Sequence, residues 1–154
     1  SFIGTDKDDA TRQMRYFHNL YAIFNITEKF GLTTGFDIGA EQKAKGSKTY
    51  NVWYSPVLIA RYQPINKLAL AARFEYYSDR NGVVISTGTP NGFATLGYSL
   101  NVDVIPVADA LIRIEGRLLQ SRQDEIFEQR NGSFTKLSPS IGLSFAYSFA
   151  HQFK

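Results

Sequence analysis

The feature that most constrains this chain is a repeated alternation of apolar and polar residues in long segments, which are joined by connections that are in turn short and long. Alternation with a period of two residues is typical of β-strands whose two faces meet different surroundings. We expect about seven such strands, one of them just before residue 41 and the others at residues 14–26, 50–63, 68–77, 93–104, 110–119 and 137–149. The long connections are residues 41–49, 78–92 and 120–136, and the short ones include residues 63–67 and 104–109.

Strands with tight turns at one end and long loops at the other predict an all-β fold, an antiparallel up-and-down meander. Transmembrane β-barrels of the outer membrane have this asymmetry. Composition agrees, because aromatic residues make up 14% of the chain while the mean hydropathy is only -0.22. Such a balance suits strands with one apolar and one polar face. No apolar run approaches the roughly 20 residues that a membrane-spanning helix needs.

The charges and the residue types exclude several functions. The 17 basic and 14 acidic residues are interspersed, so no basic block of the kind that binds nucleic acid is present. The absence of cysteine excludes disulfides and thiolate metal sites. The two histidines lie far apart in the sequence and neither has the spacing of metal ligands. We therefore expect no catalytic residues, no metal, no cofactor and no nucleic-acid partner.

The two faces of the expected strands differ in charge, and this sets their orientation. An Arg or Lys that faces lipid at mid-depth costs about 2–4 kcal/mol, so the charged faces should point to a polar interior. A soluble barrel would reverse the two faces, but strands of about 12 residues at roughly 3.3 Å each are long for a soluble fold and match a tilted membrane span. The lipid-facing wall is predicted to include Leu70, Ala72, Phe74, Leu96, Leu100, Ile112, Ile114, Leu143 and Phe145.

The charged faces supply the candidate functional residues. The predicted pore-lining residues are Arg61, Arg73, Glu75, Asn101, Asp103, Arg113, Glu115 and Arg117. Two interpretations remain open at this point. The side chains form ion pairs that fill or stiffen a small lumen, or they set the electric field that selects solutes in a wet lumen. In the second case a surplus of arginine would favour anions.

Two segments have a less regular pattern. In residues 14–26 both faces carry aromatic side chains, Tyr16 and Phe24 against Phe17 and Tyr21, so the lipid-facing side is not determined. In residues 50–63, Pro56 lies inside a segment that is apolar on both faces. Because proline cannot donate a ladder hydrogen bond, Pro56 predicts a bulge or a locally unpaired position.

The number of strands is odd, which has a topological consequence. If the aromatic C-terminal segment, residues 149–154, lies on the periplasmic side, the first long strand runs downward like the last one. Residues 5–9 then form an extracellular loop, and residues 1–4 end a preceding upward strand. Bacterial single-chain barrels have even strand counts, and an open edge in lipid leaves backbone groups unpaired. We therefore expect residues 1–154 to be the C-terminal part of a single, larger barrel domain.

Three stretches carry a resemblance to a known family: Trp53-Tyr54-Ser55-Pro56, residues 75–93 (EYYSDRNGVVISTGTPNGF) and Arg113-Ile114-Glu115-Gly116-Arg117. They resemble the C-terminal portion of the putative β-barrel porin-2 (OmpL-like) family of Bacteroidota outer membranes. The resemblance covers nearly the whole chain, and residues 75–93 are its most specific part. It implies a porin-like protein of the cell outer membrane in a Gram-negative envelope.

The sequence thus predicts an outer-membrane porin that passes small hydrophilic solutes by passive diffusion through a charge-lined lumen. The alternative is a structural or accessory barrel of a larger outer-membrane assembly, its lumen closed by side chains. Expected partners are outer-membrane lipid and the missing N-terminal strands of the same barrel. Other outer-membrane proteins or further copies of the chain remain open as partners. A barrel-borne enzyme is disfavoured for want of a nucleophile and base.

Overall fold

The structure is a computed structural model that describes residues 2–3 and 8–149, with side chains from residue 8 onward. Its long strands are β2 (Arg15–Asn25), β3 (Phe30–Gln42), β4 (Tyr50–Ile65), β5 (Leu68–Asp79), β6 (Phe93–Val104), β7 (Ala110–Ser121) and β10 (Leu137–Tyr147). Three two-residue strands complete the set: β1 (Phe2–Ile3), β8 (Phe127–Glu128) and β9 (Phe134–Thr135). In the described residues no helix is long and apolar enough to cross a membrane.

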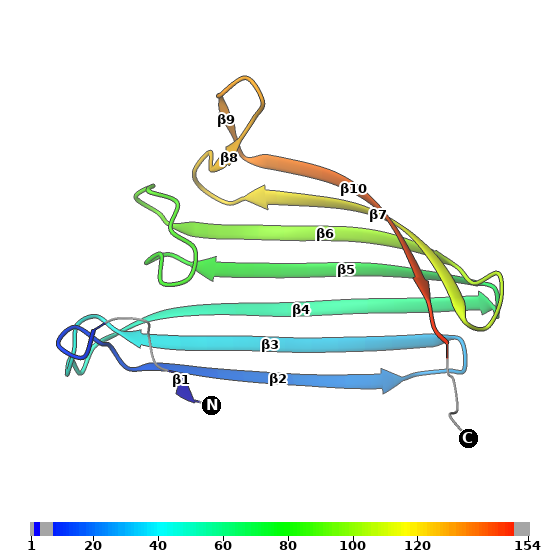
Figure 1. The fold of residues 1–154 in the computed structure, drawn as a ribbon, viewed down its shortest axis with the longest axis horizontal. Helices are drawn as coiled ribbons and strands as arrows, with labels where there is room; N and C mark the ends of the chain where they lie inside the picture. The colour runs from blue at the N-terminus through cyan, green and yellow to red at the C-terminus, as the bar shows by residue number, and fades with distance from the viewer. Residues whose placement is uncertain (1, 4–7, 150–154) are drawn as a thin grey trace.

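The seven long strands form one antiparallel sheet in which each strand pairs with its neighbours in the chain (Figure 1). The sheet order is β1-β2-β3-β4-β5-β6-β7-β10, and β8 and β9 form a separate small hairpin. The long connections lie at one end of the sheet and the tight turns at the other, here called the long-loop end and the tight-turn end (Figure 1). The predicted all-β up-and-down architecture is therefore confirmed.

The sheet is not closed into a barrel within the described residues. Its outermost long strands are β2 and β10, with only the two-residue β1 outside β2, and both long strands run from the long-loop end to the tight-turn end (Figure 1). The predicted preceding strand is present as β1, in which Phe2 pairs with Tyr16 and Ile3 with Arg15 in antiparallel register. The rest of the predicted N-terminal loop, residues 4–7, and the aromatic segment from residue 150 onward lie outside the described residues.

The pairing registers place the apolar residues on one face of the sheet. Leu70 pairs with Val102, Val102 with Ile114, and Ile114 with Leu143, so this row lies on a single face, the apolar face. All nine residues predicted to face lipid lie on it, and Leu100 is 68% exposed. The side chains on this face cover no core of their own, as expected for a wall whose apolar side is solvated by lipid.

The register between β2 and β3 resolves the ambiguous N-terminal strand. Asn19 pairs with Asp37, and the Asn19 side-chain amide donates a hydrogen bond to that carboxylate. This places Asn19 on the face opposite the apolar one, the polar face, together with Phe17 and Tyr21. Tyr16 and Phe24 therefore share the apolar face. Sequence alternation could not decide this because aromatics occupy both parities.

Two prolines interrupt the pairing of β4 with β5. The register passes directly from Tyr54–Ser78 to Val57–Glu75, so Pro56 is at a locally unpaired position, one of the two predicted forms. The predicted turn over residues 63–67 is too long, because only residues 66–67 lie between the two strands. Strand β4 continues to Ile65, with a register shift between Tyr62 and Ile65 that contains Pro64. Because proline has no N–H to offer the ladder, a shift of register accommodates it within the strand.

The long connections also differ from the expected ones. Strands β3, β5 and β7 extend beyond their predicted ends to Gln42, Asp79 and Ser121. The last long loop contains the β8–β9 hairpin, which turns through Gly132 with a φ of 81°. This left-handed conformation favours glycine, and alternation has no signal for so short a hairpin.

Candidate functional site

All eight predicted pore-lining residues lie on the polar face of the sheet. The registers align them in rows across strands β4 to β7: Arg73 pairs with Ser99, and Ser99 with Arg117. One row nearer the tight turns, Asn101 pairs with Glu115, and one row further Asp103 pairs with Arg113. Arg61 of β4 joins the Asn101 row through Ala71. We call these eight residues the charged wall.

Asp103 and Arg113 form the best-defined ion pair of the charged wall. Nε of Arg113 donates to Oδ1 of Asp103 at 2.7 Å, and one terminal nitrogen donates to Oδ2 at 2.8 Å. Two parallel hydrogen bonds between a guanidinium and a carboxylate fix both the distance and the plane of the pair. The pair follows directly from the register, because the two residues face each other across β6 and β7.

Glu75 links two arginines from different strands. Its two carboxylate oxygens accept hydrogen bonds from Arg73 on the same strand and from Arg117, which lies two strands away on β7. Gly97 of β6 makes this span possible: a Cβ atom there would come within 2.6 Å of the Glu75 side chain. The absent side chain leaves room for Glu75 to lie across β6.

The remaining wall residues, Arg61, Asn101 and Glu115, lie outside the hydrogen-bonded pairs described above. Arg61 attracts Asp103 across the sheet, and Glu115 attracts Arg113 on its own strand. The Oδ1 atom of Asn101 is buried and has no hydrogen-bond partner among the described residues. These three positions are thus brought onto the wall but are not joined into its hydrogen-bonded pairs.

The charges of the wall are layered by sign. The paired carboxylates are deep, with side-chain exposures of 13% for Glu75 and 5% for Asp103. Their arginine partners are at the surface, with exposures of 44% for Arg73 and 40% for both Arg113 and Arg117. Because a guanidinium has five donors, each arginine keeps donors available beyond its ion pair. The surface that the wall presents is therefore positive.

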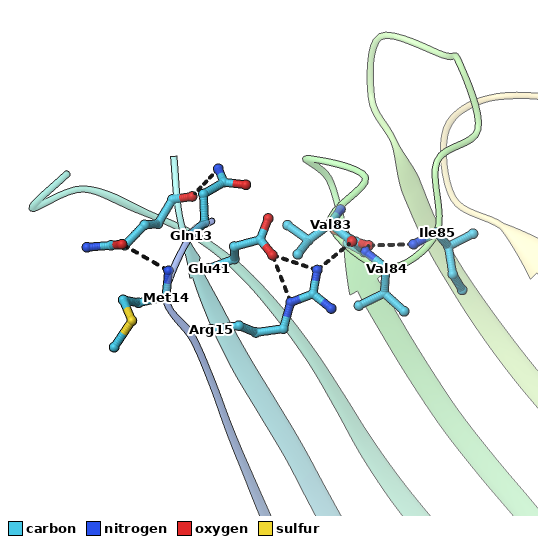
Figure 2. Close-up of polar contacts among 9 residues, drawn as sticks. Gln13, Met14, Arg15, Glu41, Val83, Val84 and Ile85 are labelled. Carbon is cyan, nitrogen blue, oxygen red and sulfur yellow. Dashed lines mark hydrogen bonds and ion pairs between the residues drawn. The ribbon is translucent and has the colours of Figure 1, made fainter. Parts of the chain in front are cut away.

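A second cluster on the polar face, at the long-loop end, was not predicted. Nε of Arg15 donates to Glu41 at 2.8 Å (Figure 2). The guanidinium carbon of Arg15 lies 5.7 Å from the centre of the Trp53 ring. Trp53 is only 5% exposed and lies against Gly39. The alternation places residues 41 and 78–79 in loops, so it does not indicate the charges at these strand ends. Glycine at residues 31, 35 and 39, every fourth position of one strand, is the sequence signal that could have indicated long side chains crossing β3.

The long loops also contact each other. The carboxylate of Asp124, in the β7–β10 loop, accepts hydrogen bonds from the backbone N–H of Asn91 at 3.2 Å and from its side-chain amide at 3.1 Å. The hydrogen bond from the Asn91 side chain holds the pKa of Asp124 below its ordinary value. This contact ties the β5–β6 loop to the β7–β10 loop.

The described residues of the charged wall group no metal ligands, and a small hollow borders the wall at the tight-turn end. In the part of the chain that the structure describes, no three acidic or histidine side chains are grouped to hold a metal ion. A hollow of about 740 Å³ lies on the apolar face, where Ala60, Ala72 and Gly116 leave a depression between larger side chains. A smaller hollow, of about 150 Å³, is lined by Arg61 and Thr33 of the polar face together with the β2–β3 turn.

An antiparallel meander with an apolar face, a polar face lined by layered charges and loops of unequal length has the features of a porin-type β-barrel wall. The chain belongs to the family described as "Putative beta-barrel porin-2, OmpL-like", whose model matches residues 1–149. No curated protein and no solved structure matches the chain. The predicted family is confirmed, and the family supports outer-membrane location and porin-like function in general terms. That the chain is the C-terminal portion of a longer barrel stays a prediction.

Proposed function

We propose that this protein is an outer-membrane porin that passes small hydrophilic solutes by passive diffusion along the charged wall. The observation that carries the proposal is the layering of charge on the polar face, where arginine side chains that are 40–44% exposed cover carboxylates that are 5–13% exposed. Such a surface is costly against lipid and favourable against water. The polar face is accordingly the lumen side and the apolar face the lipid side.

The proposal includes partners for the two open edges of the sheet. Unpaired N–H and C=O groups in the hydrocarbon region cost several kcal/mol each, so β2 and β10 require further strands. We propose that strands of the same barrel supply them, beginning with the strand of which β1 is the end, and that outer-membrane lipid covers the apolar face. No catalytic step, cofactor or metal belongs to this function.

The layering also predicts the sign of the selectivity. The charged wall contains four arginines and three carboxylates, and two of the carboxylates are beneath their partners. A solute in the lumen meets guanidinium donors first, and rings of arginine favour anions in pores. The porin is therefore anion-preferring, with small carboxylates and phosphates as the solutes best matched to the wall.

The test is electrical recording of the intact barrel in planar lipid bilayers. We expect open channels that prefer anions, and the double variant Arg113→Gln/Arg117→Gln should shift the reversal potential toward cation preference. The double variant Arg122→Gln/Arg130→Gln makes the same charge change in the β7–β10 loop, away from the wall, and is the matched control. Equal selectivity in the wall variant and the parent would place these arginines outside the conducting path.

A structural or accessory barrel is the second candidate, and one observation favours it. At the long-loop end the polar face is densely filled, with Trp53 buried against Gly39 and the Asp79 carboxylate wholly buried. About 8 strands leave a barrel interior just filled by side chains, whereas 16–18 leave an aqueous channel. Intact barrels that insert into bilayers without any conductance would favour this second function.

A further inference from the structure

We propose that the β5–β6 loop, residues 80–92, is folded back over the polar face at the long-loop end and forms the narrowest part of the solute path. Asp79 and Arg15 are its positioning residues. The inference rests on the proposed porin function, which it deepens by naming the segment that limits solute size. It is carried by contacts that fix the loop from two sides of the sheet.

Asp79 fixes the first side. It is the last residue of β5, it alternates in phase with the residues of the polar face, and its exposure is 0%. Its carboxylate accepts hydrogen bonds from three successive backbone N–H groups, those of Val83 at 2.9 Å, Val84 at 2.7 Å and Ile85 at 2.9 Å. Gly82 enables this turn with a φ of 62°, a left-handed conformation that favours glycine. The segment 83–85 is thereby wrapped around one buried carboxylate.

Arg15 fixes the second side from a distant strand. A terminal nitrogen of Arg15, on β2, donates to the backbone carbonyl of Val83 at 3.4 Å (Figure 2). Strands β2 and β5 are separated by β3 and β4, which at about 4.8 Å per strand places their axes roughly 14 Å apart. A contact between Arg15 and Val83 therefore requires the loop to extend back across the polar face toward β2.

The anchor for this contact is itself held rigidly. Glu41 binds the Arg15 guanidinium at 2.6 Å, and Trp53 packs beneath it against Gly39. The orientation of the guanidinium is thus set before it meets the loop. The same loop is tied to the β7–β10 loop through Asn91 and Asp124. Contacts on β2, β5 and the β7–β10 loop together leave the segment 83–85 little freedom to swing away from the lumen.

The chemistry of the segment indicates what it would restrict. Val83, Val84 and Ile85 are all apolar, and Val84 and Ile85 are exposed. A narrow passage bordered by apolar side chains and one arginine offers few hydrogen bonds to replace a hydration shell. It would admit small solutes and exclude large, strongly hydrated ones, while the charged wall beyond it determines the preference for charge.

Two measurements test the inference separately: a distance between spin labels gives the position of the loop, and conductance gives the size of the passage. The chain has no cysteine, so nitroxide labels on Val84→Cys in the loop and Val52→Cys in β4 give one defined distance in the full chain reconstituted in lipid. We expect a narrow distance distribution in the parent pair. Adding Arg15→Met, or separately Asp79→Ala, should broaden the distribution and shift it to longer distances. Arg130→Met and Glu128→Ala, at the β8–β9 hairpin, are the matched controls and should leave it unchanged.

The same substitutions without labels are then compared in planar bilayers. Arg15→Met should raise single-channel conductance and admit larger uncharged solutes, and Asp79→Ala should do so more strongly. Because Asp79→Ala removes a buried carboxylate, Arg15→Met keeps the test valid if that variant does not fold.

An unchanged distance distribution in Arg15→Met would overturn the folded-back loop. A released loop with unchanged conductance in an open channel would overturn its role as the constriction. A loop that is released by the variants in a barrel that never conducts would overturn the porin function on which the inference rests.

Discussion

Trp53 lies against Gly39 on the polar face, with its ring in the space that any other side chain at position 39 would occupy. A Cβ atom at residue 39 would overlap the indole ring far inside van der Waals contact. The two residues are register partners across β3 and β4. The absence of a side chain on one strand therefore determines where the largest side chain of the next strand lies, and with it the platform beneath Arg15.

The variant Gly39→Ala should destabilise the fold by about 1–3 kcal/mol, the usual cost of overpacking a filled site. The added methyl group displaces the indole ring, and Arg15 loses its support. Urea unfolding of the lipid-reconstituted protein measures the free energy. Gly142→Ala is the matched control, because it lies on the same face and an added Cβ meets nothing within 4 Å. Equal effects of the two substitutions would contradict the packing explanation.

The orientation of the wall in the membrane is tested by two substitutions to arginine at nearly equal depth. Leu100→Arg places a charge on the apolar face and should lower the free energy of unfolding by about 2–4 kcal/mol if the position is near the bilayer midplane. Thr33→Arg places the same side chain on the polar face, in the row that contains Arg73 and Ser99. It should be tolerated. The reverse order of the two effects would mean that the polar face meets the lipid.

Glu75→Gln should strengthen anion preference. The substitution keeps the shape of the side chain but removes the negative charge shared by Arg73 and Arg117. The expected shift in reversal potential is opposite in sign to that of the double variant Arg113→Gln/Arg117→Gln. Glu128→Gln, in the β8 strand, removes a charge of the same sign outside the wall and should leave the reversal potential where it is. A shift toward cations in Glu75→Gln would be incompatible with the layered wall.

The contact between the loops should weaken in acid. Hydrogen bonding by Asn91 lowers the pKa of Asp124 in the folded state, so the contact contributes stability above the ordinary aspartate pKa of about 3.9 and loses it as the pH falls toward the lower folded value. The protection of the Asn91 backbone amide against hydrogen exchange, compared with the intrinsic exchange rate at the same pH, should therefore fall only in this acid range. In Asp124→Asn the acid-dependent change should be absent, and its persistence there would assign it to another group.

Much of the fold is predictable because it follows from a single physical rule, the unlike surroundings of the two faces. The strands around Leu70, Leu100 and Ile114 alternate strictly, so their number, order and orientation could be read from the sequence. The same rule is silent for β2, where Phe17 and Tyr21 place aromatics on the polar face. There the orientation depends on pairing with Asp37 of the neighbouring strand.

The same rule separates the part of the candidate site that the sequence predicts from the part that it does not. The Asp103–Arg113 pair was predictable, since both residues have the polar parity of adjacent strands. The Arg15–Glu41 cluster and the buried Asp79 were not, because they lie at strand ends that alternation assigns to loops. Their positions depend on side chains that span several strands, such as Arg15 reaching Val83, and on glycines that leave room for Trp53 and Glu75. Neither feature has a local pattern.

The shared direction of β2 and β10 limits which molecules can complete the wall. A second copy inserted with its long loops on the same side of the membrane would place its β2 beside β10 along a parallel seam, in which hydrogen bonds are slanted and slightly weaker. A copy inserted upside down would form an antiparallel seam but would expose its long loops to the opposite compartment. Only an odd number of intervening strands, the first aligned with β1, keeps every neighbour antiparallel and every long loop on one side. The shared direction of the two strands thus supports the proposal that further strands of the same barrel, and not seven-strand copies of this chain, close the wall.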